Sequence, residues 1–422
     1  MKANQHILII GGGTAGIMTA AQLIKKNKNL SISILEPSEK HYYQPAFTLV
    51  GAGTYDYKKT IRLTKDLIPK GVKWIKDFAT EILAEEKQVK TATSGNISYD
   101  LLVVATGLVN DLDGIGIEGL REGLEKGVVC SNYVDPNKTW ELLQKFKGGN
   151  AVFTQPTTPI KCGGAPQKAA YMAADYFRKK GISNKTNLVF ATPGSVIFGV
   201  KIIADSLMKV IGDYNIHFKT FYAPIKIDSD NKIVYFKEVS TGENKCVVNE
   251  NNILNEKHTG NEIMEIPFDF LHLAPPQAPP KFIRESNLVN AAGWLDVHIN
   301  SLQHNKFTSI FGLGDVAGLP TAKTGAAIRK QVPVVVDNIL KYLANQTVDN
   351  QGYLGYSSCP LVVGYGKMIL AEFNYKNEFT PDPKLKQMLV FDSNKPHWRL
   401  WFLKKYMLPH LYWNKMMKGE NV

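Results

Sequence analysis

The sequence predicts an α/β protein of more than one domain, built on parallel sheets. Short apolar, β-branched runs recur along the chain, several of them end at glycine turns, and patterns of helical spacing follow those turns. A length of 422 residues favours two or three domains, and 44% hydrophobic with 21% charged residues is ordinary globular composition. This composition excludes a disordered chain, a collagen and a disulfide-stapled miniprotein.

The chain opens with one strand–helix–strand unit. Its parts are the strand His6–Ile10, the glycine turn 11–16, a helical pattern over 17–27, the strand Ser31–Leu35 and the acid Glu36. Unpaired N–H groups and the dipole at the start of such a helix attract a pyrophosphate, and the turn G-x-G-x-x-G leaves room for it. An acid twenty residues beyond the last glycine suits a free ribose 2′-hydroxyl, which predicts FAD or NAD rather than NADP.

Further elements continue this alternation. In chain order they are short strands with charged turns over 74–99, a strand at 101–107, a strand beginning near residue 150, a helix after Cys162, a strand at 187–194, and helix mixed with aromatic hairpin-like stretches from about Gly325. The predicted fold is therefore two Rossmann-like dinucleotide-binding domains in tandem plus a C-terminal membrane-associating region. We expect an FAD-binding domain formed by 1–115 and 285–345, a second domain over 116–284, and a quinone- and membrane-contacting region over 346–422.

Two later motifs favour FAD. LLVVATG at 101–107 and TSIFGLGD at 308–315 resemble the paired motifs of flavoproteins with two dinucleotide-binding domains, in which the aspartate after the second strand bonds the ribityl chain. In those flavoproteins a second glycine turn receives NAD(P)H. The corresponding turn here, at 192–199, has only two glycines and carries bulky residues between them. We expect this second domain to bind no pyridine nucleotide, so that the reductant comes from elsewhere.

The four cysteines include no C-x-x-C pair, so neither a disulfide scaffold nor a metal site is predicted. Cys162 lies at a glycine turn leading into a helix, whose dipole would lower the pKa of its thiol. Cys359 precedes a proline in a glycine- and aromatic-rich stretch. For either cysteine alone, a buried small apolar side chain is the simpler interpretation.

Over nearly its whole length the sequence resembles the sulfide:quinone oxidoreductases, most closely the branch that includes the mitochondrial enzyme. The stretches that carry this resemblance are HYYQPAFTLVGAG (41–53), KCGGAPQKAAYM (161–172), LQHNKFTSIFGLGDVAGLPTAKTGAA (302–327), SSCPLVVGYGKMILAEF (357–373) and LPHLYWNKMMKG (408–419). The resemblance implies that Cys162 and Cys359 meet on one face of the flavin and cycle through a disulfide or a sulfur-bridged form. Sulfide would attack Cys359 and release the Cys162 thiolate beside flavin C4a.

The other cysteines and the proton acceptor are less defined. Cys130 resembles the third cysteine of other bacterial members, and we expect it to assist sulfur shuttling, to lie near the flavin, or to be a bystander, whereas Cys246 is interpreted as a bystander. Many bacterial members have an acid after the first redox cysteine. Here Gly163 and Gly164 follow Cys162, which leaves the proton acceptor open.

The resemblance also implies which residues contact FAD. They are Gly11, Gly13, Thr14, Ala15 and Gly16 at the pyrophosphate, Glu36 at the adenosine ribose, Ala79 at the adenine, Gln44 on the flavin side, Gly107 of the LLVVATG motif, Asp315 at the ribityl chain and Lys323 near the flavin pyrimidine. A cation at Lys323 would stabilise the anionic reduced flavin.

The C-terminal tail predicts contact with a lipid surface. Residues 395–422 carry six Lys or Arg against one Glu, so five of the net charge of +12 lie here, among six Trp, Phe and Tyr residues, with Pro409 dividing the tail into two short segments. Such aromatics suit the headgroup layer and lysines reach anionic lipid. A helix packed on its own core or at a dimer interface is the alternative. No stretch is long and apolar enough to cross a bilayer and no cleavable leader is expected.

These observations predict an FAD enzyme that oxidises hydrogen sulfide to sulfane sulfur, polysulfide or the persulfide of a small acceptor, and reduces ubiquinone or menaquinone. Candidates for the quinone slot are Phe47, Tyr365, Phe391 and Tyr412. We expect a peripheral protein of a bacterial inner membrane with no nucleic-acid partner, and leave a homo-oligomer open. The alternatives are a type II NADH:quinone oxidoreductase, the flavin subunit of a periplasmic sulfide dehydrogenase, and a non-catalytic membrane-bound sulfide sensor.

Overall fold

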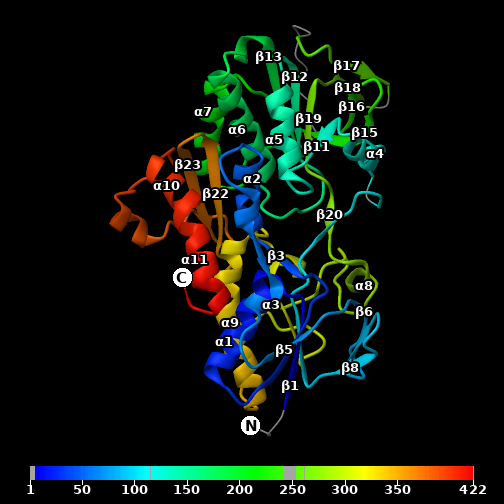
Figure 1. Cartoon of the computed structure of the whole chain (residues 1–422), viewed down its shortest axis with the longest axis vertical. Helices are drawn as coiled ribbons and strands as arrows, with labels where there is room; N and C mark the ends of the chain where they lie inside the picture. Colours follow the sequence, from blue (N-terminus) through cyan, green and yellow to red (C-terminus); the bar gives the residue numbers. More distant parts are fainter. Residues whose placement is uncertain (1–4, 115, 241–252, 261, 422) are drawn as a thin grey trace.

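The computed structural model describes residues 5–114, 116–240, 253–260 and 262–421, so that Cys246 lies outside the described residues. Two parallel five-stranded sheets, one above the other in Figure 1, form the centres of two α/β domains. The predicted fold of two Rossmann-like units is confirmed.

The first sheet has the strand order β21-β9-β1-β2-β5, with every neighbouring pair parallel. Its strands are β1 (His6–Ile10), β2 (Ser31–Leu35), β5 (Val72–Ile75), β9 (Leu101–Val104) and β21 (Ile310–Gly312). The helices α1 (Thr14–Lys26) and α9 (Gly325–Leu343) pack together beside this sheet (Figure 1). Because β21 and α9 come late in the chain, this domain is assembled from two distant segments.

The second sheet has the order β11-β19-β12-β13-β14 and is also parallel throughout. Its strands are β11 (Val129–Cys130), β12 (Gly149–Thr154), β13 (Thr186–Ala191), β14 (His217–Lys219) and β19 (Phe270–Leu273), and its helices are α5 (Pro136–Lys145), α6 (Ala165–Lys179) and α7 (Lys201–Asp213). An antiparallel sheet of β15 (Tyr222–Asp228), β16 (Ile233–Glu238), β18 (Ile263–Pro267) and β17 (Lys257–Thr259) packs next to it.

Smaller elements complete both domains. They are β3 (Lys40–Tyr42), β4 (Ile61–Leu63), β6 (Ala79–Leu83), β7 (Gln88–Thr91), β8 (Asn96–Ser98), β10 (Val109–Asn110), β20 (Gln277–Ala278), α2 (Phe47–Val50), α3 (Thr64–Leu67), α4 (Leu120–Glu125) and α8 (Lys281–Arg284). The two crossings of the chain between the domains pair with each other as β10 and β20.

The C-terminal part lies along both domains (Figure 1). It consists of the hairpin β22 (Ser357–Gly364) and β23 (Lys367–Phe373), the helix α10 (Trp398–Phe402), a π turn at Leu403–Met407 and the helix α11 (Leu408–Asn414). Tyr412, Met416 and Met417 join the core of the first domain, whereas Leu400 and Leu403 pack in a separate apolar cluster with α2 and the hairpin. None of the described helices is long and apolar enough to cross a bilayer.

Pro409 does not divide the tail, contrary to the sequence prediction. It lies in the first turn of α11, directly after the π turn, and the helical path continues from residue 398 to residue 414. A proline removes one backbone donor and crowds the carbonyl of the preceding turn. The wide turn at Leu403–Met407 accommodates both effects, so the segment remains one rod with inner and outer faces.

The glycine turn gives a test of the fold. A Cβ on Gly16 would overlap the carbonyl oxygen of Gly11, so Gly16→Ala must push α1 away from β1. We expect the free energy of unfolding to fall by about 1–3 kcal/mol, measured by urea titration, with weaker retention of FAD. Gly212→Ala in α7 is the control, because a Cβ there meets nothing within 4 Å and adds about 0.5–1 kcal/mol of helix propensity. Equal stability of the two variants would contradict this account.

Candidate functional site

The glycine turn between β1 and α1 leaves the start of the helix open, as a phosphate group would require. Gly11 has φ of +105° and its Cβ would overlap the Ala105 carbonyl, whereas a Cβ on Gly13 would meet nothing within 4 Å. The first two glycines of the motif therefore have different roles. Gly11 allows the ends of β1 and β9 to approach each other, and Gly13 leaves the start of α1 open. Thr14 and Ala15 form the first turn of α1, where backbone N–H groups point outward.

Glu36, directly after β2, closes this turn. Its carboxylate accepts hydrogen bonds from the backbone N–H of Gly12 at 2.6 Å and of Ser38 at 2.7 Å. Burial raises the pKa of this carboxyl, and the two backbone bonds oppose the rise. Ala79 begins β6, four residues beyond the strand β5 whose end bonds to the N–H of Glu36.

A second group of polar residues lies at the start of α9. The Lys323 ammonium donates to the backbone carbonyls of Asp315 at 2.7 Å and Ala317 at 3.0 Å, and lies 3.8 Å from the centre of the Trp294 ring. Burial lowers the pKa of Lys323 to about 8 and raises that of Asp315. A small cavity is lined here by Asp315, Lys323 and Thr324 among others.

These residues fit FAD. The Asp315 carboxylate is half-buried and makes no hydrogen bond to the described residues, and the buried Thr106 hydroxyl, two residues after β9 and beside Gly107, has no partner there either. Buried polar atoms without partners are costly, so a hydroxyl-bearing ligand is expected to satisfy them. With the open face at Gly13, they could hold a ribityl chain and a pyrophosphate.

Cys162 and Cys359 come together from different domains. Their Sγ atoms are 3.4 Å apart although 197 positions separate them in the chain. Cys162 has a left-handed backbone with φ of +51°, a strained conformation for a residue with a side chain. A Cβ on Gly164 would lie 2.9 Å from the Cys359 Sγ and 2.6 Å from Leu361. Gly164 is therefore required for β22 to reach the cysteine turn, a role that the sequence did not reveal.

Lys168, one turn into α6, is the second residue that sequence reasoning missed. Its ammonium donates to the Cys162 Sγ at 3.0 Å, and its side chain is buried with no carboxylate partner among the described residues. The hydrogen bond from Cys359 and the charge of Lys168 hold the pKa of Cys162 well below its ordinary value, against the effect of burial, while that of Cys359 is raised. The Lys168 ammonium thus favours the negative charge on Cys162 over Cys359.

The segment 322–324 holds both cysteines. The backbone N–H of Cys162 donates to the Lys323 carbonyl at 2.7 Å. The Ser357 hydroxyl, two residues before Cys359, donates to the Ala322 carbonyl at 3.1 Å and lies 2.9 Å from the Thr324 hydroxyl. One short stretch of backbone therefore positions the sulfur pair and the Lys323–Asp315 group together.

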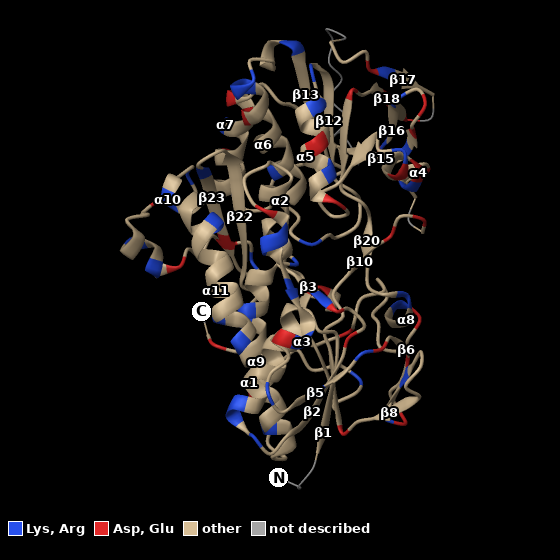
Figure 2. Cartoon of the chain, in the orientation of Figure 1, with Lys and Arg blue, Asp and Glu red and all other residues tan. Residues whose placement is uncertain are grey.

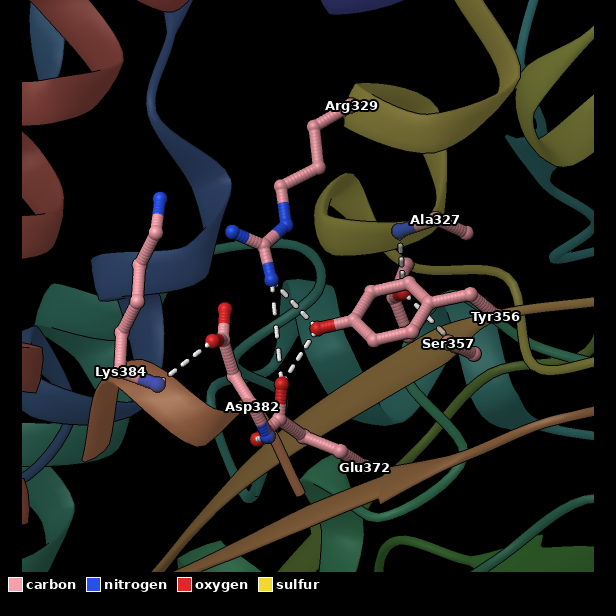
Figure 3. A network of polar contacts seen from close by, with 8 residues as sticks. Ala327, Arg329, Tyr356, Ser357, Glu372, Asp382 and Lys384 are labelled. Atoms are coloured by element: carbon pink, nitrogen blue, oxygen red, sulfur yellow. Dashed lines mark hydrogen bonds and ion pairs between the residues drawn. The ribbon is translucent and has the colours of Figure 1, made fainter. Parts of the chain in front are cut away.

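A buried ion network attaches the hairpin to α9 (Figure 3). Arg329 of α9 donates to the Tyr356 hydroxyl, which donates in turn to the Glu372 carboxylate at 2.5 Å. Glu372 is 1% exposed and also accepts the N–H of Asp382 at 2.9 Å. Because Tyr356 directly precedes Ser357, this network fixes the start of β22 and with it the position of Cys359.

The remaining predicted residues are more scattered. Cys130 is buried in the second sheet, where its thiol donates to the Leu271 carbonyl at 3.4 Å and burial raises its pKa to about 12; no contact with the sulfur pair is found in the described part of the chain. Gln44 is exposed and accepts a hydrogen bond from Lys161 at 3.2 Å.

The four quinone candidates do not form one group. Tyr412 is buried against the glycine turn, with its hydroxyl 2.7 Å from that of Thr14 and 2.5 Å from His41 Nε2. Tyr365 is partly buried and donates to the Ala52 carbonyl at 2.8 Å. Phe47 packs against Tyr42 and Tyr57, and Phe391 is 72% exposed.

Comparisons with known proteins first define the class. Residues 5–146 match the family described as pyridine nucleotide-disulphide oxidoreductase. The structure also resembles the crystal structure of the sulfide:quinone oxidoreductase from Aquifex aeolicus. The match covers 99% of this chain and 92% of that one, with a TM-score of 0.76 at 21% identity. The fold is thus that of the flavin-dependent disulfide reductases.

Two curated relatives define the family. The chain is 38% identical to the mitochondrial sulfide:quinone oxidoreductase of Mus musculus, covering 99% of this chain and 87% of that protein. It is 40% identical to the mitochondrial sulfide:quinone oxidoreductase of Dictyostelium discoideum, covering 100% and 87%. The chain belongs to the sulfide:quinone oxidoreductases, as its sequence predicted, and its cofactor is FAD.

The ion pair at Cys162 gives a test. Removing the cation in Lys168→Met should raise the pKa of Cys162, because the thiolate loses its partner. The pH at which alkylation by iodoacetamide reaches half its maximal rate should therefore rise by about one pH unit or more, with the modified peptide identified by mass spectrometry. Lys180→Met, at the exposed far end of the same helix, should leave the alkylation profile unchanged. A profile unaltered in Lys168→Met would show that Lys168 does not set the thiolate.

Proposed function

We propose that this protein oxidises hydrogen sulfide and transfers two electrons through FAD to a quinone, with Cys162 and Cys359 as the sulfur-reacting pair. The observation that carries this proposal is the 3.4 Å approach of the two sulfurs, with the Cys162 Sγ held by Lys168 at 3.0 Å. A buried lysine paired to sulfur rather than to carboxylate is an arrangement that stabilises a thiolate leaving group.

In the oxidised state the pair is a disulfide. Hydrosulfide attacks the Cys359 sulfur, the bond between the cysteines breaks, and its electron pair leaves on the Cys162 sulfur, where Lys168 stabilises the negative charge. The sulfur atom gained remains on Cys359 as a persulfide. When bound, FAD would supply the two-electron acceptor that lets Cys162 and Cys359 close again as a disulfide once the persulfide sulfur has left, and the donor of those electrons to quinone. A further sulfur nucleophile, either a small acceptor or a second sulfide, removes the persulfide sulfur.

The structure favours this function over NADH oxidation. In the second domain nine residues separate the end of β13 from the start of α7, and Ile197 and Phe198 of this loop pack into the core. The strand β14 ends at Lys219, which pairs with Glu256 in the interior, where an acid would be needed for a ribose. We infer that no pyridine nucleotide binds here. A non-catalytic sensor would not require the Cys162–Lys168 pair.

We further propose that the outer face of the C-terminal segment lies on a membrane surface. Large apolar side chains exposed there are Leu389, Phe391, Trp398, Phe402, Tyr406 and Met407. Basic side chains accompany them: Arg399 lies on α10, Lys405 in the π turn, and the exposed Lys395 and Lys415 lie before α10 and after α11 (Figure 2). Apolar area rimmed by basic side chains suits an anionic lipid interface, through which a lipid quinone can reach the protein. This proposal includes residence at a bacterial inner membrane and a quinone that is either ubiquinone or menaquinone.

The cysteine mechanism predicts that each thiol is essential. In Cys162→Ser and Cys359→Ser the disulfide cannot form, so sulfide-dependent reduction of a short-chain quinone should fall by at least about a thousandfold. Flavin absorbance under sulfide should stay oxidised on the same time scale. Cys130→Ser is the matched control for a buried cysteine outside the pair, and its turnover decides whether Cys130 assists sulfur shuttling. Turnover that survives in either pair variant would overturn the mechanism, and bleaching by NADH instead of sulfide would overturn the function.

The membrane proposal predicts a separable effect. Trp398→Ser with Phe402→Ser removes two side chains that are 60% and 47% exposed, each contributing about 1 kcal/mol when buried in lipid. Binding to vesicles containing anionic lipid should weaken roughly thirtyfold in a sedimentation assay, while turnover with a soluble quinone is retained. Met208→Ser, also exposed but on α7, should bind as the unchanged protein does. Equal binding of all three would refute the assignment of this face.

A further inference from the structure

Lys404 is a buried cation that the proposed membrane surface does not use. It lies in the π turn between Phe402 and Tyr406, which are 47% and 54% exposed, yet Lys404 itself is 3% exposed. Its Nζ donates to the Pro45 carbonyl at 2.8 Å, and in the described part of the chain it has no other hydrogen-bond partner and no carboxylate. A buried ammonium with unused donors is costly, so such groups are retained for function.

The titratable groups that act on Lys404, and its hydrogen-bond acceptor, belong to the sulfur site or its border. They are the Lys168 ammonium from α6, Cys162 from the turn before α6, Cys359 from β22 and the neutral Pro45 carbonyl. Burial and the charge of Lys168 lower the pKa of Lys404 to about 7, although both cysteines oppose the fall. A lysine in this setting exchanges between amine and ammonium near neutral pH, as an acid–base group requires.

The two lysines are therefore not equivalent. Lys168 is bound to the Cys162 sulfur, whose negative charge and hydrogen bond raise the pKa of Lys168 against burial, so it remains a cation. Lys404 makes no hydrogen bond to either sulfur and gives up its proton more easily. One cation can hold the leaving thiolate while the other takes up a proton.

We propose that Lys404 accepts the proton that hydrosulfide loses when its sulfur is bound by the cysteine pair, an inference that rests on the proposed function. Hydrosulfide forms a bond to the Cys359 sulfur, the Cys162–Cys359 bond breaks, and its electron pair leaves on Cys162. The proton of the resulting persulfide passes to the neutral amine of Lys404. This gives a persulfide anion and an ammonium, and no further oxidant is needed until the electrons enter FAD.

The test compares two nucleophiles on the FAD-loaded, oxidised protein. Hydrosulfide carries a proton to be lost, whereas sulfite also opens disulfides but carries none on its sulfur. Opening of the pair is followed by flavin absorbance for sulfide and by the mass of the Cys359 adduct for sulfite. Total sulfide is adjusted at each pH so that the hydrosulfide concentration stays constant. The variants are Lys404→Met and Lys404→Arg, with Lys384→Met, an exposed lysine of the same region, as control.

In the unchanged protein and in Lys384→Met we expect the hydrosulfide rate to rise with pH through about 7, as Lys404 becomes an amine. Both Lys404 variants should react with hydrosulfide on the order of a hundredfold more slowly and without this rise, but with sulfite within about threefold of the unchanged rate. Arginine keeps the charge and cannot accept the proton, which guards against a folding defect in the methionine variant.

Three results would overturn the inference. An equal fall for both nucleophiles would mean that Lys404 only attracts anions. A normal rate and pH profile in Lys404→Arg would mean that charge alone suffices. Absence of flavin reduction by sulfide in the unchanged protein would remove the proposed function, and this role with it.

Discussion

The site depends on one short stretch of backbone. The carbonyls of Ala322 and Lys323 hold, respectively, the start of β22 and the amide of Cys162, so two cysteines from distant parts of the chain are held by adjacent peptide groups. The Lys323 side chain continues from the same stretch to the carbonyls of Asp315 and Ala317. A displacement of this segment would change the sulfur spacing and the cofactor side together. The Arg329–Tyr356–Glu372 network makes such a displacement costly, because separating buried charges leaves one of them unpaired.

The charge balance around the two sulfurs depends on which ionisable groups are buried beside them. Lys168 and Lys404 are both buried, and neither has a carboxylate partner within the described ranges. The interior can tolerate two such cations only if an anion is formed between them or one of them is neutral. A thiolate at Cys162 satisfies the first condition, and the lowered pKa of Lys404 satisfies the second.

Much of this architecture could be predicted from the sequence, for reasons that are local. The strand before Gly11, the helix after it and Glu36 follow one another within a short stretch, so periodicity and spacing are sufficient. The pairing of Cys162 with Cys359 came from resemblance, since no local pattern brings two segments 197 positions apart into contact. Lys168 and Lys404 were not predicted, because a lysine on a helix is ordinarily exposed and only the packing of α6 and the π turn buries these two. The π turn itself has no simple sequence signal, so Pro409 was interpreted as a break.

The order of the strands also bears on how the chain is made. The second sheet is complete once β19 has been synthesised, at Leu273, whereas the first sheet lacks β21 until Gly312 and its glycine turn lacks Tyr412 until almost the last residue. During synthesis from the N-terminus, the second domain can therefore fold while the first is still an unfinished sheet with an exposed edge. The glycine turn is therefore complete only when Tyr412 packs against β1 and α1.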